Sequence, residues 1–591
     1  MATQGSEPVA TAAGAAAAAT LYQANHGDTA DVIIVGAGVA GLGAAQRLMR
    51  SPSTQHLRVV VLEAGSQVGG RLRADRTFFK DGTPLDVGAE LVHGADNEMV
   101  HLAQAAGTQL HELFTWSQGD GGPSEEPAPD GSVGYYWLPS EKRMARYNDL
   151  PEEVEHMHRI LEESGDVAQS MFDSPEALAT ARNLKAGGQG TVSHHLASEG
   201  IKGDALALAV SGFGNTTGGN LEELSFERIG SFERAWGKDG EGADFRMVGG
   251  YTAFLRWISS GVAVALDTAV SAIQTDDDDD ACEYPVSVSF ERQHAPSVAG
   301  DIACRTEVAS APPVGQVVHA AGGTLRCKRV IVTIPPPALR SGFVRFTPPL
   351  SVERTAALNR IQLRNGIKVA LKFKSRVWPA DCMGLVSGGT IFPEMWMNHV
   401  DGVGAEVAPP TVAPHAQGLQ PLADALRAGQ LPAGTARCSK AGFPTEDAPF
   451  LVIGFAMGPF ADALLRLPPA EIVRRMLQQL ATMFQDHVPN SAIAFSSAFV
   501  MGRVYSWALD KWVQGAYTCP SLLEHPGDRA ELAKPHAEGR VLFAGEAVSG
   551  ANEASDSPLT LHGALRTGLQ AAGELAAGLG GEGGGSAAAK L

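Results

Sequence analysis

One strand–turn–helix–strand unit near the N-terminus constrains this chain more than any other feature. The run 31–35 is short, apolar and rich in β-branched residues, which predicts a buried parallel strand. Three glycines with the spacing G-x-G-x-x-G follow it, and a helical pattern over 42–49 comes next. A second strand pattern over 58–62 completes a βαβ unit from residue 31 to residue 64. This order of elements is typical of a dinucleotide-binding fold.

The turn and the acidic residue after the second strand have separate expected roles in nucleotide binding. Gly36 permits the tight turn, Gly38 lets the backbone approach a pyrophosphate, and Gly41 lets the helix pack close to the sheet. The helix N-terminus presents N–H groups and a positive dipole to the phosphates. Glu63, at the end of the second strand, is placed to accept hydrogen bonds from a ribose diol. A glycine-rich turn without a ligand is the alternative, and the acidic residue at this spacing disfavours it.

The composition limits the expected number of domains and the kinds of partner. The chain has 591 residues, of which 44% are hydrophobic, so about two to four packed domains are expected. With 46 Lys and Arg against 65 Asp and Glu, the formal net charge is −19, which argues against nucleic acid as the main partner. The six cysteines lack a CxxC pair, so neither a zinc site nor a disulfide framework is expected. No apolar run reaches about 18 residues, so no membrane-spanning helix is expected.

Both ends of the chain and several internal segments have the composition of tails or loops. Residues 1–30 hold no Lys or Arg and are expected to form a disordered tail, and 579–591 a flexible one. The C-terminal Ala589-Lys590-Leu591 resembles a peroxisomal address, which predicts an import receptor as a partner; a chance tripeptide is the alternative. Loops or insertions are expected at 119–132, 275–283, 295–323 and 400–446.

Five further segments carry specific motifs when they are taken together with the βαβ unit. They are Gly69-Gly70-Arg71, 86–91, 330–335, 543–547 and 559–564. With them the chain resembles the flavin-dependent amine oxidase superfamily from about residue 31 to residue 577, the insertions excepted. The resemblance implies an α/β fold with a discontinuous Rossmann-like FAD-binding domain and a second, substrate-binding domain with a mixed sheet and helices.

The resemblance also predicts how the segments are divided between the two domains. The FAD-binding domain is expected to combine 31–110, 245–340 and 500–578. The substrate-binding domain is expected to combine 111–244 and 341–499. Each domain is therefore assembled from segments that lie far apart in the sequence.

The family resemblance assigns FAD contacts to individual positions. Positions that match Glu63 and Arg71 hold the ribose and the pyrophosphate, and the match to Val270 contacts the adenine side. Glu546 is expected beside the ribityl phosphate, and the backbone of residues 560–561 beside the isoalloxazine. Besides the three glycines of the turn, the full expected set is Glu63, Arg71, Gly88, Glu90, Leu91, Val270, Trp512, Glu546, Thr560 and Leu561.

One position bears on how FAD is attached. Family members with covalent FAD carry a cysteine in a Gly-Gly-Cys-Tyr segment. The matching segment here is Gln514-Gly515-Ala516-Tyr517, so Ala516 stands where those members have the cysteine. The resemblance therefore implies non-covalent FAD.

Lys368 lies in an alternating strand pattern over 364–373 and is a candidate catalytic residue. Lys368, Ala370 and Lys372 are expected on one face of that strand. The resemblance maps Lys368 onto the family lysine that contacts flavin N5 through a water and assists reoxidation by O2. A solvated surface charge is the alternative, and it is the interpretation we favour for Lys372 and Lys374.

Aromatic residues after residue 506 match the family segment that walls the catalytic pocket. Tyr517 is expected to form one side of an aromatic cage, and Trp507 is expected either in the pocket wall or in an ordinary core. Thr560 stands where some members have a second cage tyrosine. In having threonine at this position, the chain is similar to peroxisomal-type polyamine oxidases and flavin histone demethylases rather than to monoamine oxidases.

His93 is the fourth candidate catalytic residue. Polyamine oxidases have His or Glu at the matching position, close to the amine of the bound substrate. A structural histidine is the alternative reading. The pair His156 and His158 lacks the i,i+4 spacing of metal ligands and is expected on the surface.

The function implied by the resemblance is FAD-dependent oxidation of a polyamine such as spermine or spermidine. Hydride passes from the carbon next to an amine nitrogen to flavin N5, and O2 is reduced to H2O2. A histone-lysine demethylase and a catalytically silent flavin-fold binding protein are the alternatives. The expected location is peroxisomal if the C-terminal tripeptide is an address, and cytoplasmic otherwise.

Overall fold

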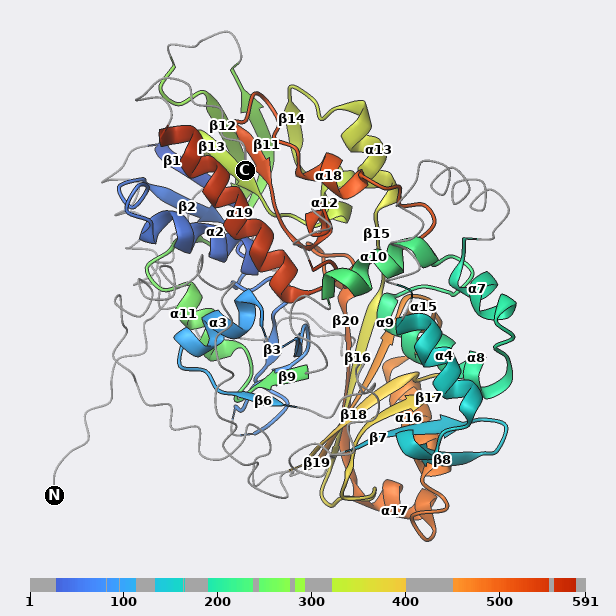
Figure 1. The fold of residues 1–591 in the computed structure, drawn as a ribbon. Coiled ribbons are helices and arrows are strands. Elements are labelled where there is room, and N and C mark those ends of the chain that lie inside the picture. The colour runs from blue at the N-terminus through green and yellow to red at the C-terminus, as the bar shows by residue number, and fades with distance from the viewer. Residues whose placement is uncertain are drawn as a thin grey trace, which may run out of the picture.

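The computed structural model describes residues 28–80, 82–94, 96–112, 133–162, 164, 190–236, 244–276, 282–292, 322–399, 450–551 and 557–580. The expected insertions fall largely outside these ranges, and so does the C-terminal tripeptide. Within the ranges, no helix combines the length and the apolar character that crossing a bilayer requires. The described residues form two large sheets with helices packed on them (Figure 1).

The first sheet has eight strands and contains the predicted βαβ unit. β1 (Thr29–Val35) runs parallel to β2 (Val59–Leu62) on one side and to β13 (Gly323–Val332) on the other. β1 is buried from its second residue on, because both faces of a parallel sheet are covered. The strand order is β10-β2-β1-β13-β12-β11-β14, with β22 beside β13. The remaining strands are β10 (Ala263–Ala265), β11 (Thr268–Thr275), β12 (Val286–Arg292), β14 (Arg345–Thr347) and β22 (Val541–Phe543).

Two helices pack against each other beside this sheet (Figure 1). They are α2 (Val39–Arg50), the helix of the βαβ unit, and α19 (Leu561–Gly580), the last described helix of the chain. A Cβ atom on Gly43 would lie 2.5 Å from Leu565 Cδ1, and one on Gly568 would lie 2.1 Å from the Ala40 oxygen. Glycine at these two positions therefore sets how closely the helices approach.

The second sheet has seven strands in the order β20-β16-β19-β18-β17-β7-β8. Its buried strand β16 (Gly366–Phe373) is antiparallel to both neighbours, β19 (Phe450–Met457) and β20 (Phe499–Ser506). The predicted alternation is confirmed, since Val369 and Leu371 face one apolar cluster and Ala370 faces another. The other strands are β7 (Val133–Leu138), β8 (Arg143–Arg146), β17 (Cys382–Ser387) and β18 (Glu394–His399).

Helices cover one face of the second sheet. The helix α16 (Pro469–Met483) has apolar residues at helical spacing and buries Ile472, Met476, Leu480 and Met483. These side chains join the same apolar cluster as the Val369 face of β16. α15 (Gly458–Leu464) and α17 (Ser491–Ala498) add residues to that cluster.

Short sheets and helices connect the two large sheets. The short strands are β3 (Ala74–Asp75), β4 (Leu85–Asp86), β5 (Leu91–His93), β6 (Leu110–Glu112), β9 (Asp244–Met247), β15 (Gln362–Leu363) and β21 (Thr518–Cys519). They pair as β3-β4, β5-β9-β6 and β15-β21. The other helices are α3 (Glu98–Ala105), α4 (Glu152–Glu162), α7 (Val192–Ser198), α8 (Gly203–Ala209), α9 (Asn215–Thr217), α10 (Phe226–Trp236), α11 (Thr252–Ile258), α12 (Pro336–Arg340), α13 (Val352–Arg360) and α18 (Asp528–Ala533).

Two strands lie across the boundaries expected between the domains. β14 joins the first sheet although it follows residue 340, and β20 joins the second sheet although it lies almost wholly after residue 500. The core beside the first sheet also includes Ile361. We therefore propose that the FAD-binding domain extends to about residue 361 and resumes at about residue 507.

Candidate active site

A cavity of about 600 Å³ lies between the two large sheets. It is lined by every residue that the sequence placed at the FAD or catalytic site, with the exception of Gly41. Gly41 lies behind the turn, where a Cβ atom would come within 2.0 Å of the Gly36 oxygen. The cavity therefore joins parts of the chain that are up to hundreds of residues apart.

The glycine turn leaves room for a phosphate at the start of α2. Gly36 has a φ of 106°, which favours glycine, and a Cβ atom on Gly38 would meet no other atom within 4 Å. No side chain caps the N-terminus of α2, and its first turn holds no acidic residue. The N–H groups of the first turn of α2 therefore have no capping side chain, which fits a pyrophosphate.

Glu63 is held at the end of β2 by backbone donors. One carboxylate oxygen accepts a hydrogen bond of 2.7 Å from the Ala37 N–H, and the other accepts one of 2.8 Å from the Gly65 N–H. Burial raises the pKa of Glu63, and these two N–H groups oppose that rise. The carboxylate therefore has a fixed orientation in the cavity wall, as a ribose acceptor requires.

Arg71 and Glu546 form an ion pair on the cavity wall. Arg71 Nη1 lies 2.9 Å from Glu546 Oε2 and donates a 2.6 Å hydrogen bond to the Ala516 carbonyl. Glu546 Oε1 accepts hydrogen bonds from the backbone and hydroxyl of Thr518. Gly88 allows the Arg71 backbone to lie against it, because a Cβ atom there would be 1.8 Å from the Arg71 oxygen.

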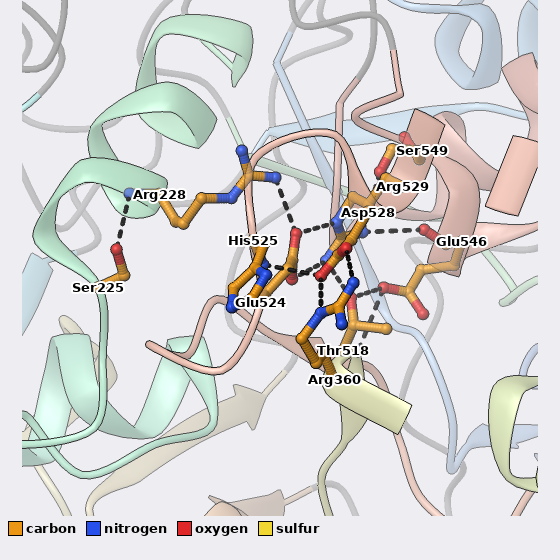
Figure 2. Close-up of polar contacts among 10 residues, drawn as sticks. All are labelled: Ser225, Arg228, Arg360, Thr518, Glu524, His525, Asp528, Arg529, Glu546 and Ser549. Atoms are coloured by element: carbon orange, nitrogen blue, oxygen red, sulfur yellow. Dashed lines mark hydrogen bonds and ion pairs between the residues drawn. The ribbon is translucent and has the colours of Figure 1, made fainter. Parts of the chain in front are cut away.

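A buried polar network supports this ion pair from behind (Figure 2). Arg529 donates to Thr518 Oγ1 at 2.8 Å, and its guanidinium also pairs with Glu524 at 2.8 Å. Arg228, on α10, pairs with the same Glu524 oxygen at 2.8 Å. The network therefore connects a helix beside the second sheet to Glu546.

The start of α19 brings Thr560 and Leu561 to the cavity. The Thr560 hydroxyl accepts a 3.0 Å hydrogen bond from the Gly563 N–H and donates one of 2.7 Å to the Ser557 carbonyl. Thr560 thus caps this helix. Val270, on β11, lines the cavity together with these residues. Thr560, Leu561 and Val270 thus line one cavity together with the glycine turn, Glu63 and Arg71. These residues supply the hydrogen-bonding groups that FAD requires.

The position of Ala516 bears on FAD attachment. Its methyl group packs against Gly366, where a Cβ atom would lie 2.6 Å from Ala516 Cβ. No thiol is present at this position for a bond to the flavin. Acid precipitation of the purified protein should therefore release all of its FAD into the supernatant, as measured by flavin absorbance. Yellow flavin in the washed pellet is the opposing result.

Lys368 is part of a buried charge cluster. Lys368 Nζ lies 2.6 Å from Glu90 Oε2 and 5.5 Å from the centre of the Trp396 ring. Arg246 pairs with the other Glu90 oxygen at 2.7 Å. Burial alone would raise the pKa of Glu90, but the two cations lower it below its usual range. Glu90 therefore holds Lys368 in place at the cavity wall.

Asp86 lies beside this cluster and was not singled out by the sequence as a chemical group. Its Oδ1 atom has no hydrogen-bond partner among the described residues. Burial, together with the charge of Glu90, raises the pKa of Asp86 to about 7. Asp86 is buried because other segments of the chain cover β4. Its burial therefore depends on the tertiary structure.

Aromatic side chains form part of the cavity wall. The Tyr517 hydroxyl donates a 2.5 Å hydrogen bond to the Thr216 carbonyl. Trp507 lies in the cavity wall and donates from Nε1 to the Val87 carbonyl at 2.9 Å, so it is fixed to the strand segment before Gly88. Trp396 and Phe455 lie with ring centres 5.3 Å apart.

Four further residues line the cavity and are not predicted from the sequence: Thr216, Glu394, Trp396 and Phe455. One signal was available, an acidic residue inside the apolar run 391–397. In a buried strand such a residue usually marks a polar site. Only the pairing of β18 with β19 shows that this site faces the cavity.

Two expectations for surface residues are wrong. Lys372 is only 3% exposed, and its Nζ lies 5.4 Å from the centre of the Phe79 ring, because β16 is covered on both faces. His158 is half-buried in the cavity wall and stacks on Tyr147, because α4 packs against the second sheet. Burial lowers the pKa of His158 to about 4. Lys374, beyond the end of β16, is exposed as expected.

His93, at the end of β5, is exposed to the cavity rather than packed in a core. Burial raises the pKa of Glu394, which also lines the cavity, to about 7, and the charge of His93 opposes that rise. Among the described residues, no group of His, Cys, Asp or Glu is arranged to hold a metal ion.

Known proteins share this sequence pattern over most of the chain. A family model described as flavin containing amine oxidoreductase matches residues 39–576. Lysine-specific histone demethylase 2 of Homo sapiens is 22% identical over 565 residues, which cover 92% of this chain and 53% of that protein. Peroxisomal N(1)-acetyl-spermine/spermidine oxidase of Homo sapiens is 24% identical over 581 residues, with 92% and 94% covered. The chain thus spans about half the length of the demethylase.

Solved structures of amine oxidases share the fold. Cyclohexylamine oxidase from Brevibacterium oxydans IH-35A has a TM-score of 0.62 at 19% identity, with 93% of this chain and 100% of that chain covered. Putrescine oxidase bound to putrescine has a TM-score of 0.62 at 18% identity, with 93% and 99% covered. The expected α/β fold, with a nucleotide-binding sheet and a second mixed sheet, is confirmed. The chain belongs to the flavin containing amine oxidoreductase family, and its cofactor is FAD.

Proposed function

We propose that this protein is a polyamine oxidase that acts on substrates such as spermine and spermidine. It oxidises the carbon next to an amine nitrogen, and water and O2 are consumed as an aldehyde, a shorter amine and H2O2 are formed. The observation that carries this proposal is one cavity that joins the FAD-fitting residues to Lys368, an aromatic wall and the carboxyl groups of Glu233 and Glu394.

The wall suits a slender aliphatic amine. Tyr517, Trp396 and Phe455 line the cavity and present apolar ring surfaces against which a methylene chain can pack. A free alkylamine is protonated at neutral pH, and desolvation by such surfaces favours its neutral, reactive form. When bound, FAD supplies the acceptor for the hydride that leaves the neighbouring carbon.

The charged groups farther along the cavity suit additional cationic nitrogens. Glu233 and Glu394 both line the cavity, and Glu394 accepts hydrogen bonds only from uncharged partners among the described residues. A monoamine has no second nitrogen to offer these carboxyl groups. A polyamine does, which is why we favour this substrate class.

We assign the remaining roles by position in the cavity. Glu63 and Arg71 bind the ribose and the pyrophosphate, and Thr560 and Leu561 lie beside the isoalloxazine. Tyr517 and Trp507 confine the substrate, and His93 lies near its amine. Lys368, held by Glu90, assists the reoxidation of the cofactor by O2. FAD is bound non-covalently.

A demethylase-like activity on methyl-lysine peptides is the second candidate. The relative that supports it is the human histone demethylase, of which the chain spans about half. A methyl-lysine side chain is also a slender cationic amine, so the same cavity could receive it. A catalytically silent flavoprotein is the third candidate, and the buried Lys368–Glu90 pair argues against it.

Anaerobic mixing of the FAD-loaded protein with different amines tests the proposal. Spermine and spermidine should bleach the flavin absorbance, whereas a monoamine and a dimethyl-lysine peptide should bleach it much more slowly. Identification of the products then shows which C–N bond is broken.

Each alternative predicts a different result in that experiment. Bleaching by the peptide alone would replace our proposal with demethylation. A flavin that no amine reduces would mark a silent binding protein. Formation of H2O2 in air, measured with a peroxidase-coupled dye, completes the test.

We further propose that the protein is peroxisomal and that Ala589-Lys590-Leu591 binds the import receptor. The tripeptide has the small, basic and leucine residues of such an address. A compartment that removes peroxide suits an enzyme that makes it.

A further inference from the structure

Asp86 is a buried carboxyl group that lacks a paired cation. It ends β4, is 3% exposed, and forms no ion pair within the part of the chain that the structure describes. Its Oδ1 atom also has no hydrogen-bond partner there. Glu90 instead takes both cations of the charge cluster, Lys368 at 2.6 Å and Arg246 at 2.7 Å. Because a buried carboxylate without a counter-charge is costly, burial favours the protonated form of Asp86.

One short segment holds Asp86 beside the charge cluster. Gly250 lets the backbone lie against the carboxyl group, because a Cβ atom there would be 2.9 Å from Asp86 Oδ2, and its φ of 72° also favours glycine. The next residue, Tyr251, is buried and reaches the other carboxyl-bearing segment, since its hydroxyl lies 3.5 Å from the Glu90 carbonyl oxygen. The segment therefore packs against Asp86 and Glu90 together.

A second, small cavity gives Asp86 a route for proton exchange with solvent. It has a volume of about 40 Å³, and its wall includes Asp86 and the exposed Arg256. This volume exceeds the roughly 10–15 Å³ that one water molecule needs. Glu90 and Lys368 line the large cavity, and Asp86 does not. The charge cluster therefore lies between the two cavities, and Asp86 can gain or lose a proton without contact with the substrate site.

We propose that Asp86 sets the net charge of the cluster at Lys368 and thereby the rate at which O2 reoxidises the reduced protein. With Asp86 protonated, the two cations and the one carboxylate of the cluster give a net charge of +1. With Asp86 ionised, the net charge is zero. Asp86 is a positioning residue, because it acts through Lys368 and Glu90 and does not line the large cavity.

The effect follows from the charge that O2 acquires. O2 takes two electrons from the reduced cofactor and two protons, from that cofactor and from solvent, to form H2O2. The electrons give the oxygen negative charge, and a fixed net positive charge nearby stabilises it. This inference rests on the proposed function, in which O2 is the electron acceptor, and deepens it by naming what regulates that step.

The charge of Asp86 should change near neutral pH. Burial, and then the charge of Glu90, raise the pKa of Asp86 to about 7. Lys368, the backbone N–H of Tyr251 and Arg246 oppose that rise. The cations hold the pKa of Glu90 below its usual range, and burial raises the pKa of Tyr251 well above its own, so neither changes charge between about pH 6 and 8. The other charged residues of the small cavity are Arg73, Arg76 and Arg256.

Asp86→Asn tests the proposal, because the amide keeps the shape of the protonated acid and cannot ionise. The FAD-loaded protein is reduced with dithionite and mixed with oxygenated buffer in a stopped-flow instrument at several pH values. The wild-type rate should fall about tenfold as the pH rises through about 7, the size expected for one unit charge acting over about 10 Å at an effective dielectric constant of about 20. Asp86→Asn should keep the higher rate throughout.

Asp31→Asn is the matched control. Asp31 is also a buried carboxyl group, 7% exposed, but it pairs with Arg58 and Lys328 and lines neither cavity. This variant should keep the wild-type dependence of the reoxidation rate on pH.

A second measurement needs no FAD. An acid whose pKa is raised in the folded protein makes the protein less stable as the pH rises from the ordinary carboxyl pKa of about 3.9 to the raised value. The melting temperature of Asp86→Asn apoprotein, relative to that of the wild type, should therefore increase between about pH 4 and 7 and stay constant above that.

The outcomes separate this inference from the proposed function. A merely structural role would slow Asp86→Asn at every pH and leave its profile parallel to that of the wild type, which would overturn the inference while amine oxidation stands. If no amine reduces the wild-type flavin, the proposed function itself fails. If Asp86→Asn does not fold or bind FAD, the wild type decides the question, because a reoxidation rate that is independent of pH contradicts the inference.

Discussion

Replacing Lys368 with methionine should slow the reoxidation of the reduced enzyme by O2 by about 10²-fold, the size of effect seen when one preorganised charge is removed from an active site. Oxygen gains negative charge as it is reduced, and a fixed ammonium group beside it stabilises that charge. Methionine is unbranched and similar in length, so the packing against Trp396 should survive. Stopped-flow mixing of the reduced enzyme with oxygenated buffer measures the rate.

Lys372→Met is the matched control for this prediction. Lys372 lies on the same strand and the same face, two residues farther along, but it contacts the Phe79 ring and does not line the cavity. Its loss should leave the reoxidation rate within about threefold of the wild type, because its charge lies away from the cavity. If both variants slow equally, the role of Lys368 is structural. If neither slows, Lys368 takes no part in the reaction with O2.

Replacing Glu524 with glutamine should have the largest effect on stability. Glu524 is fully buried between the guanidinium groups of Arg228 and Arg529, which are each 1% exposed (Figure 2). The substitution leaves two buried cations without their counter-charge, which costs about 3–5 kcal/mol. Denaturant unfolding in excess FAD measures the loss of free energy.

The same substitution should also weaken FAD binding. Arg529 positions Thr518, which in turn donates to Glu546 beside Arg71. A displaced Arg529 therefore disturbs the ion pair at the cavity wall. Titration of the apoprotein with FAD should show weaker binding, and this readout is separate from catalysis.

Arg228→Met is the control for this second prediction. It leaves Glu524 paired with Arg529, so it should cost less than Glu524→Gln. A Glu524→Gln variant within about 1 kcal/mol of the wild type would show that the network contributes little.

The pH dependence gives a further check on the network. Burial would raise the pKa of Glu524, but Arg529 and Arg228 lower it below its usual range. The wild type therefore keeps this stabilisation above the ordinary carboxyl pKa of about 4.3 and loses it as the pH falls through the lowered value. The difference between wild type and Glu524→Gln should shrink in acid.

The sequence alone predicts the nucleotide-binding end of the molecule well. The βαβ unit could be located because its strand, glycine spacing and acidic residue are consecutive, so local pattern and local structure coincide. The strand around Lys368 and the helix over 467–486 could also be predicted, since period-2 and helical spacing are local signals.

The errors and omissions concern residues whose surroundings come from distant segments. Lys372 carries a charge and looks like a surface residue, but β19 and β20 enclose its strand. Glu394 stands alone in an apolar run, and no neighbouring residue shows that Thr216 and Asn215 will satisfy it. His158 lies on a helix whose burial depends on the second sheet.

By itself, the amino-acid sequence determined the glycine turn of the nucleotide-binding unit and the strand that carries Lys368. It also determined which residues of that strand share a face. These properties depend on backbone periodicity and on glycine, which act over a few residues. Only the tertiary structure decided which charges meet, such as Lys368 with Glu90, and that Glu394 accepts hydrogen bonds from the uncharged Asn215 and Thr216 among the described residues. Pairing and burial depend on contacts between segments hundreds of residues apart, and such contacts leave no local pattern in a single sequence.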